Sequence, residues 1–146
     1  MTETRFMNKI DPSNLDKLET LNIADFVTTS RSTFAHPHVL EDGSWISMGL
    51  NVSSTQCYYE FLRYKVDDQV NTSTNMCEKA EVIGRFPTTY RYTISYFHSF
   101  GLSKNYIIYM ETALRFDIYS YLKNKLLNKP FSETLHMYKD EPTVIH

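Results

Sequence analysis

Residues 95–111 read SYFHSFGLSKNYIIYME, and this stretch decides the fold class that the sequence predicts. Aromatic and β-branched residues fill its two ends, where such side chains pack well on a pleated sheet. Gly101, Ser103 and Asn105 separate the two ends and give the middle a typical turn composition. We therefore expect a strand over 95–100, a turn over 101–105 and a second strand over 106–111.

Short strands and turn signals also alternate along the rest of the chain. Asp42-Gly43 is a hairpin signal between strands expected at 37–40 and 45–50. Many short strands separated by turns favour a sandwich, a barrel or a propeller. The predicted class is all-β, with one or two short helices and a single domain over 1–146. Further strands are expected at 5–10, 17–21, 56–66, 81–85, 135–138 and 143–145, the last two as another hairpin.

One segment, 116–131, departs from the strand pattern because its apolar residues recur near helical spacing. The simpler interpretation is a helix packed on the core, with a solvated edge of lysines. The alternative is a helix that faces a membrane, with apolar side chains in the lipid and lysines against anionic headgroups. The residues of that possible membrane contact are Leu122, Lys123, Lys125, Leu126, Leu127 and Phe131.

Composition excludes several classes of protein. A hydrophobic content of 42% and an aromatic content of 14% exclude an intrinsically disordered chain. The net charge of −2 gives no electrostatic reason to expect a nucleic-acid partner. Cys57 and Cys77 do not form a C-x-x-C motif, so we expect reduced thiols. The residues after Met1 are polar, so we expect no signal peptide and a cytoplasmic location, with membrane association as an alternative.

Two histidines lie in apolar, strand-prone surroundings: His36 in AHPH (35–38) and His98 in SYFHSFG (95–101). A buried imidazole needs a polar partner, and several converging neutral imidazoles commonly share a transition metal. A histidine beside aromatic residues is more commonly a satisfied core or turn residue, and the residues alone leave both interpretations open. His38 is a third candidate, because it shares a strand face with His36 if Pro37 keeps the pleat.

Three stretches of the chain resemble one known family, the carotenoid cleavage oxygenases, which includes β-carotene dioxygenases and the retinoid isomerase of the retinal pigment epithelium. The resemblance implies a seven-bladed β-propeller in which four histidines hold a non-haem ferrous iron on the axis. His36 matches the first ligand and His98 the second, whereas His38 matches a histidine that is not a ligand. The stretches are TET (2–4) with NKIDP (8–12) and LDKLETL (15–21); AHPH (35–38) with DG (42–43) and MG (48–49); and SYFHSFGL (95–102) with NYII (105–108).

The same resemblance implies roles for two residues near the N-terminus. Glu3 matches an outer-shell carboxylate, which would accept a hydrogen bond from the distal ring nitrogen of a ligand histidine and so fix the orientation of the ring. Thr2 would lie near a substrate tunnel. The implied reaction is oxidative cleavage of a carotenoid double bond by dioxygen, with Fe(2+) as cofactor and apocarotenal or retinal products.

The sequence also departs from the family pattern. Phe34 stands where the family has Thr, Ile94 stands where it has Pro, and the third and fourth ligand motifs do not occur within 1–146. We therefore expect part of a propeller, about two or three blades at four strands each, that is inactive by itself. The alternatives are a non-catalytic truncated paralogue or splice form, or a retinoid isomerohydrolase-type member, that binds apolar polyenes at a membrane.

Overall fold

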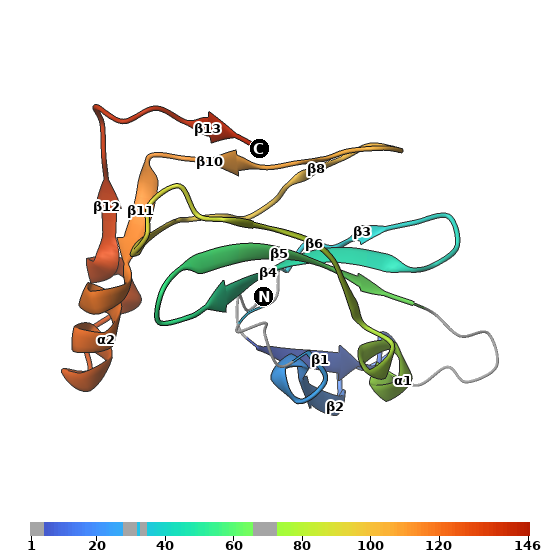
Figure 1. Ribbon diagram of the computed structural model, residues 1–146. Helices are drawn as coiled ribbons and strands as arrows, with labels where there is room; N and C mark the ends of the chain where they lie inside the picture. The colour runs from blue at the N-terminus through green and yellow to red at the C-terminus, as the bar shows by residue number, and fades with distance from the viewer. Residues whose placement is uncertain (1–4, 28–31, 33–34, 66–72) are drawn as a thin grey trace. The chain divides into compact units, whose positions relative to one another are not determined.

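The computed structural model describes residues 5–27, 32, 35–65 and 73–146, and it shows mostly β-strands with two short α-helices in those ranges (Figure 1). The chain divides into two compact units. The first contains residues 1–52 and 58–86, and the second contains residues 53–57 and 87–146. Each unit is described by itself below. The prediction of an all-β class with one or two short helices is confirmed.

The first unit begins with an antiparallel hairpin of β1 (Phe6–Ile10) and β2 (Lys17–Asn22), in which Phe6 lies opposite Asn22. The carboxylate of Asp11 accepts the backbone N–H of Ser13 at 2.8 Å and so closes the turn. This Asx-type bond is the reason why Asp is favoured at such a position. The strands predicted over 5–10 and 17–21 are therefore confirmed.

The main sheet of the first unit has the strand order β3-β4-β5-β6, in which each strand lies beside its neighbour in the sequence. Its predicted Asp42-Gly43 hairpin is confirmed. Gly43 has a φ of 76°, a value that glycine adopts without a steric penalty, and Asp42 accepts the N–H of Ser44 at 2.9 Å. A meander of four consecutive strands is also the layout of one propeller blade. The bounds are β3 (His38–Val39), β4 (Trp45–Val52), β5 (Cys57–Tyr64) and β6 (Glu81–Pro87).

A small core lies between this sheet and two short helical segments. Ile23 and Val27 come from the turn that contains η1 (Ile23–Asp25), and Cys77 comes from α1 (Ser73–Glu78). They pack against Leu62 and Tyr64 of β5. Burial raises the pKa of the Cys77 thiol to about 11, which keeps it protonated at neutral pH. Cys57 and Cys77 are both free and buried.

The second unit is built around a three-stranded antiparallel sheet, β12-β11-β7, with β11 in the centre. Two two-stranded sheets, β8-β9 and β10-β13, accompany it, and α2 follows β11 directly. The bounds are β7 (Thr93–Ser95), β8 (Gly101–Leu102), β9 (Ile107–Ile108), β10 (Met110–Glu111), β11 (Leu114–Asp117), α2 (Ile118–Leu126), η2 (Phe131–Thr134), β12 (Leu135–Met137) and β13 (Val144–Ile145).

The hairpin predicted around 101–105 is confirmed, since β8 pairs antiparallel with β9 and Gly101 lies opposite Ile108. The helix predicted in the segment 116–131 is likewise confirmed as α2, although residues 116 and 117 still belong to β11. The strand predicted over 95–100 is wrong after Ser95. The last hydrogen bond between β7 and β11 joins the N–H of Tyr96 to the carbonyl of Leu114 at 2.7 Å. Because β11 runs antiparallel and begins at Leu114, residues 97–100 have no β11 residue opposite them.

The predicted hairpin between 135–138 and 143–145 is also wrong. The two strands exist, but β12 pairs with β11 and β13 pairs with β10. The connection between them carries Glu141, whose carboxylate forms an ion pair with Arg115 of β11. The chain therefore leaves one sheet and enters another instead of folding back on itself.

Candidate metal site and its surroundings

His36 lies in the segment that leads into β3, and its side chain is exposed. His38 differs from it, because it is half-buried and pairs with Ile46 in the β3–β4 ladder. The Pro37 between them has no N–H to give to a ladder, so β3 begins only after it. The structure thus places His36 ahead of the sheet and His38 within it.

His98 lies in the connection 96–100 between β7 and β8, and its side chain is exposed. Both ends of this connection are fixed. Ser95 is completely buried at its start, and Phe100 is 6% exposed at its end. The imidazole is therefore carried by a short loop between two anchored residues.

His36 belongs to the first unit and His98 to the second, so the structure does not bring the two predicted ligands together within one unit. In the described part of the chain, no group of three or more His, Cys, Asp or Glu side chains is arranged to hold a metal ion. The predicted Glu3 and Thr2 lie outside the described residues. Their roles stay predictions.

Close to the His98 connection, a buried ionic cluster surrounds Arg115, which sequence reasoning did not single out. The Arg115 side chain is fully buried and lies 3.6 Å from the ring centre of Tyr90 and 5.2 Å from that of Tyr138. It forms an ion pair with Glu141 and donates from Nε to the carbonyl of Thr112 at 3.2 Å. Hydrogen bonds from Arg115 and then Tyr90 lower the pKa of the Glu141 carboxyl. The cluster ties β11 to the segments on both sides of it in the sequence.

A buried acid of this unit, Glu111, was also missed. Both of its carboxylate oxygens accept the N–H of Thr89, at 3.1 and 3.2 Å, and one lies 3.0 Å from Nε2 of His146. His146 directly follows β13, and its backbone exchanges two hydrogen bonds with that of Tyr109, at 2.9 and 3.2 Å. The sequence carries one weak signal for Glu111, an acidic residue at the end of an apolar strand.

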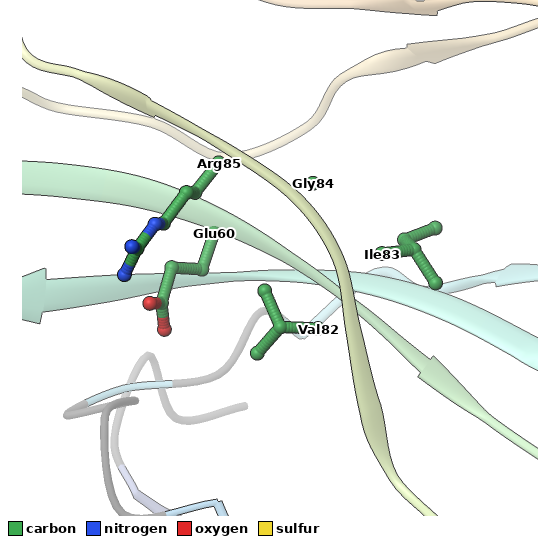
Figure 2. Close-up of a pocket in the computed structure, with 5 residues that line it drawn as sticks. All are labelled: Glu60, Val82, Ile83, Gly84 and Arg85. Atoms are coloured by element: carbon green, nitrogen blue, oxygen red, sulfur yellow. The ribbon is translucent and has the colours of Figure 1, made fainter.

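The first unit contains a pocket of about 300 Å³ beside β6. The residues that line it are Glu60 of β5 and Val82, Ile83, Gly84 and Arg85 of β6. Figure 2 shows Glu60, Val82 and Arg85 on one side of the β6 ribbon and Ile83 on the other. The Glu60 carboxylate is buried and accepts from Nδ2 of Asn51 at 2.9 Å. Among the described residues, neither His36 nor His98 lines this pocket.

α2 presents an apolar surface to solvent. None of its residues is buried, and Leu126 is 85% exposed. Within this chain its contacts are with neighbouring rings, Tyr119 with Tyr92 at 5.2 Å and Tyr121 with Phe131 at 6.1 Å between ring centres. Lys129, just after the helix, pairs with Glu133 at 3.0 Å. The exposed apolar side chains of this surface are Tyr119, Tyr121, Leu122, Leu126, Leu127 and Phe131.

In the described ranges, no helix is both long and apolar enough to cross a bilayer.

Known proteins resemble the chain over most of its length. It is 35% identical to a mitochondrial carotenoid-cleaving dioxygenase of Macaca fascicularis over 90% of this chain and 23% of that protein. It is 30% identical to a carotenoid isomerooxygenase of Drosophila melanogaster over 99% of this chain and 22% of that protein. It is 27% identical to a β,β-carotene 15,15'-dioxygenase of Rattus norvegicus over 99% of this chain and 26% of that protein. The chain thus spans about a quarter of the length of these relatives.

The family model described as retinal pigment epithelial membrane protein matches residues 1–146, which is the whole chain. This match agrees with the three resembling stretches of the sequence, which are spread over both compact units. The chain therefore belongs to the family of the retinal pigment epithelial membrane protein and the carotenoid oxygenases.

Proposed function

We propose that this chain is part of a non-haem iron oxygenase that cleaves a carotenoid double bond to apocarotenal or retinal products. The observation that carries the proposal is the family match over residues 1–146, together with relatives named for carotenoid cleavage and isomerooxygenation. Because the chain spans about a quarter of those relatives, the activity is proposed for the complete protein.

The donor chemistry of the chain fits Fe(2+). His36 and His98 are both exposed imidazoles, and imidazole nitrogen is a suitable ligand for ferrous iron. They would supply two of four ligands, and Glu3 would accept from the distal nitrogen of one of them. When bound, iron supplies the redox chemistry by which dioxygen and one double bond become two carbonyl groups. The contribution of this chain is to hold and orient two of the ligands.

The fold proposed for the complete protein is a seven-bladed propeller, of which this chain would form about two or three blades. The β3-β4-β5-β6 meander supports this proposal because it has the strand order of one blade. In this arrangement 1–146 is part of one propeller domain, and Thr2 lies near the substrate tunnel. A retinoid isomerohydrolase-type member, or a truncated non-catalytic paralogue or splice form that binds apolar polyenes, is the alternative function.

Single substitutions of histidine in the complete protein test the metal assignment. His36→Ala and His98→Ala should each abolish carotenoid cleavage and remove bound iron. His38→Ala is the matched control, since His38 lies two residues from His36 but belongs to the β3 ladder. It should leave the iron content unchanged. Stoichiometric iron in the His98→Ala protein would count against the assignment.

We also propose that α2 and the residues after it meet a membrane surface peripherally, which would place a cytoplasmic protein beside lipid-dissolved substrates. The exposed leucines of α2 and the neighbouring Lys123 and Lys125 support this, because apolar groups enter lipid while lysines meet anionic headgroups. Leu126→Ser with Leu127→Ser should weaken binding to phosphatidylserine-containing vesicles in a flotation assay. The control, Val39→Ser, changes an apolar residue on β3 whose exposure, 67%, lies between those of Leu127 and Leu126, 56% and 85%. Equal binding by both proteins would refute the membrane surface.

A further inference from the structure

The connection that carries His98 is short, and the residue just before it is held by a side-chain hydrogen bond. Ser95, the last residue of β7, is completely buried. Its hydroxyl oxygen accepts the backbone N–H of Thr112 at 2.7 Å and lies 3.1 Å from the Thr112 hydroxyl. At Tyr96, the next residue, the ladder to β11 makes its last bond. The Ser95 hydroxyl therefore fixes the point at which the chain leaves the sheet toward His98.

Thr112 is itself a rigid anchor. Its carbonyl accepts from Nε of Arg115, whose guanidinium lies against Tyr90 and is paired with Glu141. Ser95 of β7 lies opposite Arg115 of β11. Thr112 therefore bonds to both strands, with its N–H to Ser95 and with its carbonyl to Arg115. A continuous series of contacts thus runs from the buried ion pair through Thr112 to Ser95.

The other end of the connection is held by packing. Phe100 is 6% exposed, and Gly101 lies opposite Ile108, where an added Cβ would already be 3.4 Å from the Ile108 Cβ. Residues 96–100 therefore have little freedom to shift along the chain. A displacement at Ser95 would move His98, because only two residues, Tyr96 and Phe97, lie between them.

We propose that the Ser95 hydroxyl is a positioning residue for His98, which it holds in place through its hydrogen bonds to Thr112. This inference rests on the proposed function, in which His98 is an iron ligand. Ser95 would not touch the metal. It would act through the backbone of 96–98, one step further from the metal than an outer-shell group that hydrogen-bonds to the ligand, whose loss commonly costs about 10- to 100-fold in metal affinity. The lower end of that range is therefore expected for Ser95.

The test uses ferrous iron and the complete protein. Ser95→Ala removes the acceptor of the Thr112 N–H and should weaken iron binding in equilibrium dialysis by about ten-fold. Ser95→Thr keeps the hydroxyl and should restore iron affinity to within about two-fold of the wild type. Ser103→Ala is the matched control. The exposed Ser103 hydroxyl accepts the N–H of Tyr106 at 3.0 Å in the β8–β9 turn, so the same kind of bond is lost beyond His98.

A second readout separates positioning from general stability. The EPR spectrum of the ferrous protein with nitric oxide reports ligand geometry, and it should change in Ser95→Ala but not in Ser103→Ala. If Ser95→Ala fails to fold, Ser95→Cys takes its place, because sulfur keeps the volume and is only a weak acceptor. Its iron affinity should then fall between those of the wild type and a His98→Ala protein.

The outcomes are distinguishable. If a folded Ser95→Ala protein binds iron as tightly as the wild type and gives the same EPR spectrum, the positioning role is overturned. The proposed function then remains intact. An equal loss of iron affinity in Ser95→Ala and Ser95→Thr would also overturn the positioning role. The size of the side chain, and not its hydroxyl, would then determine the affinity. A wild-type protein that holds no iron would overturn the proposed function and this role with it.

Discussion

At the scale of single residues, Arg115 stands out because a fully buried cation is tolerated only when its neighbours compensate for lost hydration. Glu141 supplies the opposite charge, and the faces of Tyr90 and Tyr138 supply cation–π attraction. The partners lie before and after β11 in the sequence. Arg115 thus joins segments that no local pattern would connect.

Truncation of Arg115 should therefore destabilise the protein strongly. Arg115→Met keeps much of the side-chain volume but leaves Glu141 without its ion-pair partner and the Thr112 carbonyl without its donor. It should lower the free energy of unfolding by about 3 kcal/mol. Urea denaturation measures this difference. The control is Arg85→Met, because Arg85 also lies over an aromatic ring, that of Tyr58 at 5.5 Å, but is exposed. Its cost should stay below about 1 kcal/mol, and equal costs for the two variants would contradict the role of burial.

The Glu141 carboxyl should make stability depend on pH in the acid range. Its pKa in the folded protein lies below the ordinary value of 4.5, because Arg115 and then Tyr90 hydrogen-bond to its charged form. The unfolded chain therefore binds more protons as the pH falls, so the stabilisation is present above pH 4.5 and is lost below it.

Comparison with Glu141→Gln isolates this carboxyl. The urea midpoint of the wild type should exceed that of the variant at neutral pH, and the difference should shrink as the pH falls below 4.5. Asp11 and Asp42 also have lowered pKa values, each because of a hydrogen bond from a nearby serine. Both residues are present in the wild type and in Glu141→Gln, so their effect on stability cancels in the difference between the two proteins. A difference that does not change with pH would show that the charge of Glu141 is not what matters.

At the scale of elements, the switch from β11 to α2 depends on one side chain. Asp117 ends the strand in an extended conformation, and its carboxylate accepts the N–H of Ser120 at 2.7 Å as the helix N-cap. Without buried residues, α2 gains little from packing on a core, so the cap carries an unusual share of its stability.

Asp117→Ala should therefore cost about 1 kcal/mol and should increase hydrogen exchange of the Ser120 amide. Asp117→Asn keeps a capping oxygen and is the matched control, with an expected loss of a few tenths of a kcal/mol at most. Hydrogen-exchange mass spectrometry over 118–127 measures the change in the helix. Unchanged exchange in Asp117→Ala would mean that α2 is held by contacts other than its cap.

At the scale of the whole molecule, local patterns predicted the strands and turns but not all of their pairings. The Asp42-Gly43 and 101–105 hairpins were predictable because turn chemistry links strands that are adjacent in sequence. The false hairpin at 135–145 has the same kind of turn signal, but β12 and β13 pair with β11 and β10 instead. Here the pairing of the strands overrides the turn signal, and the ion pair between the buried Arg115 and the half-buried Glu141 ties the connection to β11.

The candidate site was predictable only in part, for a related reason. His36 and His98 could be singled out because their stretches resemble those of a known family. Arg115 could not, and Glu111 only weakly from its place at the end of an apolar strand, since the local sequence does not show that a charged residue on a short strand is buried. Their partners Glu141 and His146 are 26 and 35 residues away in the sequence. Only the pairing of the strands brings such groups together.

The last prediction concerns the 146-residue chain expressed by itself, which should neither hold iron tightly nor cleave carotenoids. It offers two of the four proposed ligands, and catalysis requires ligand geometry to be fixed closely. Strand β6 is also an edge of its sheet, with Val82 and Ile83 exposed, so the isolated chain should be poorly soluble. Purified chain incubated with ferrous iron, oxygen and β-carotene in detergent tests this. Retinal formed above the level of a His36→Ala, His98→Ala double variant would show that these residues suffice for a working enzyme.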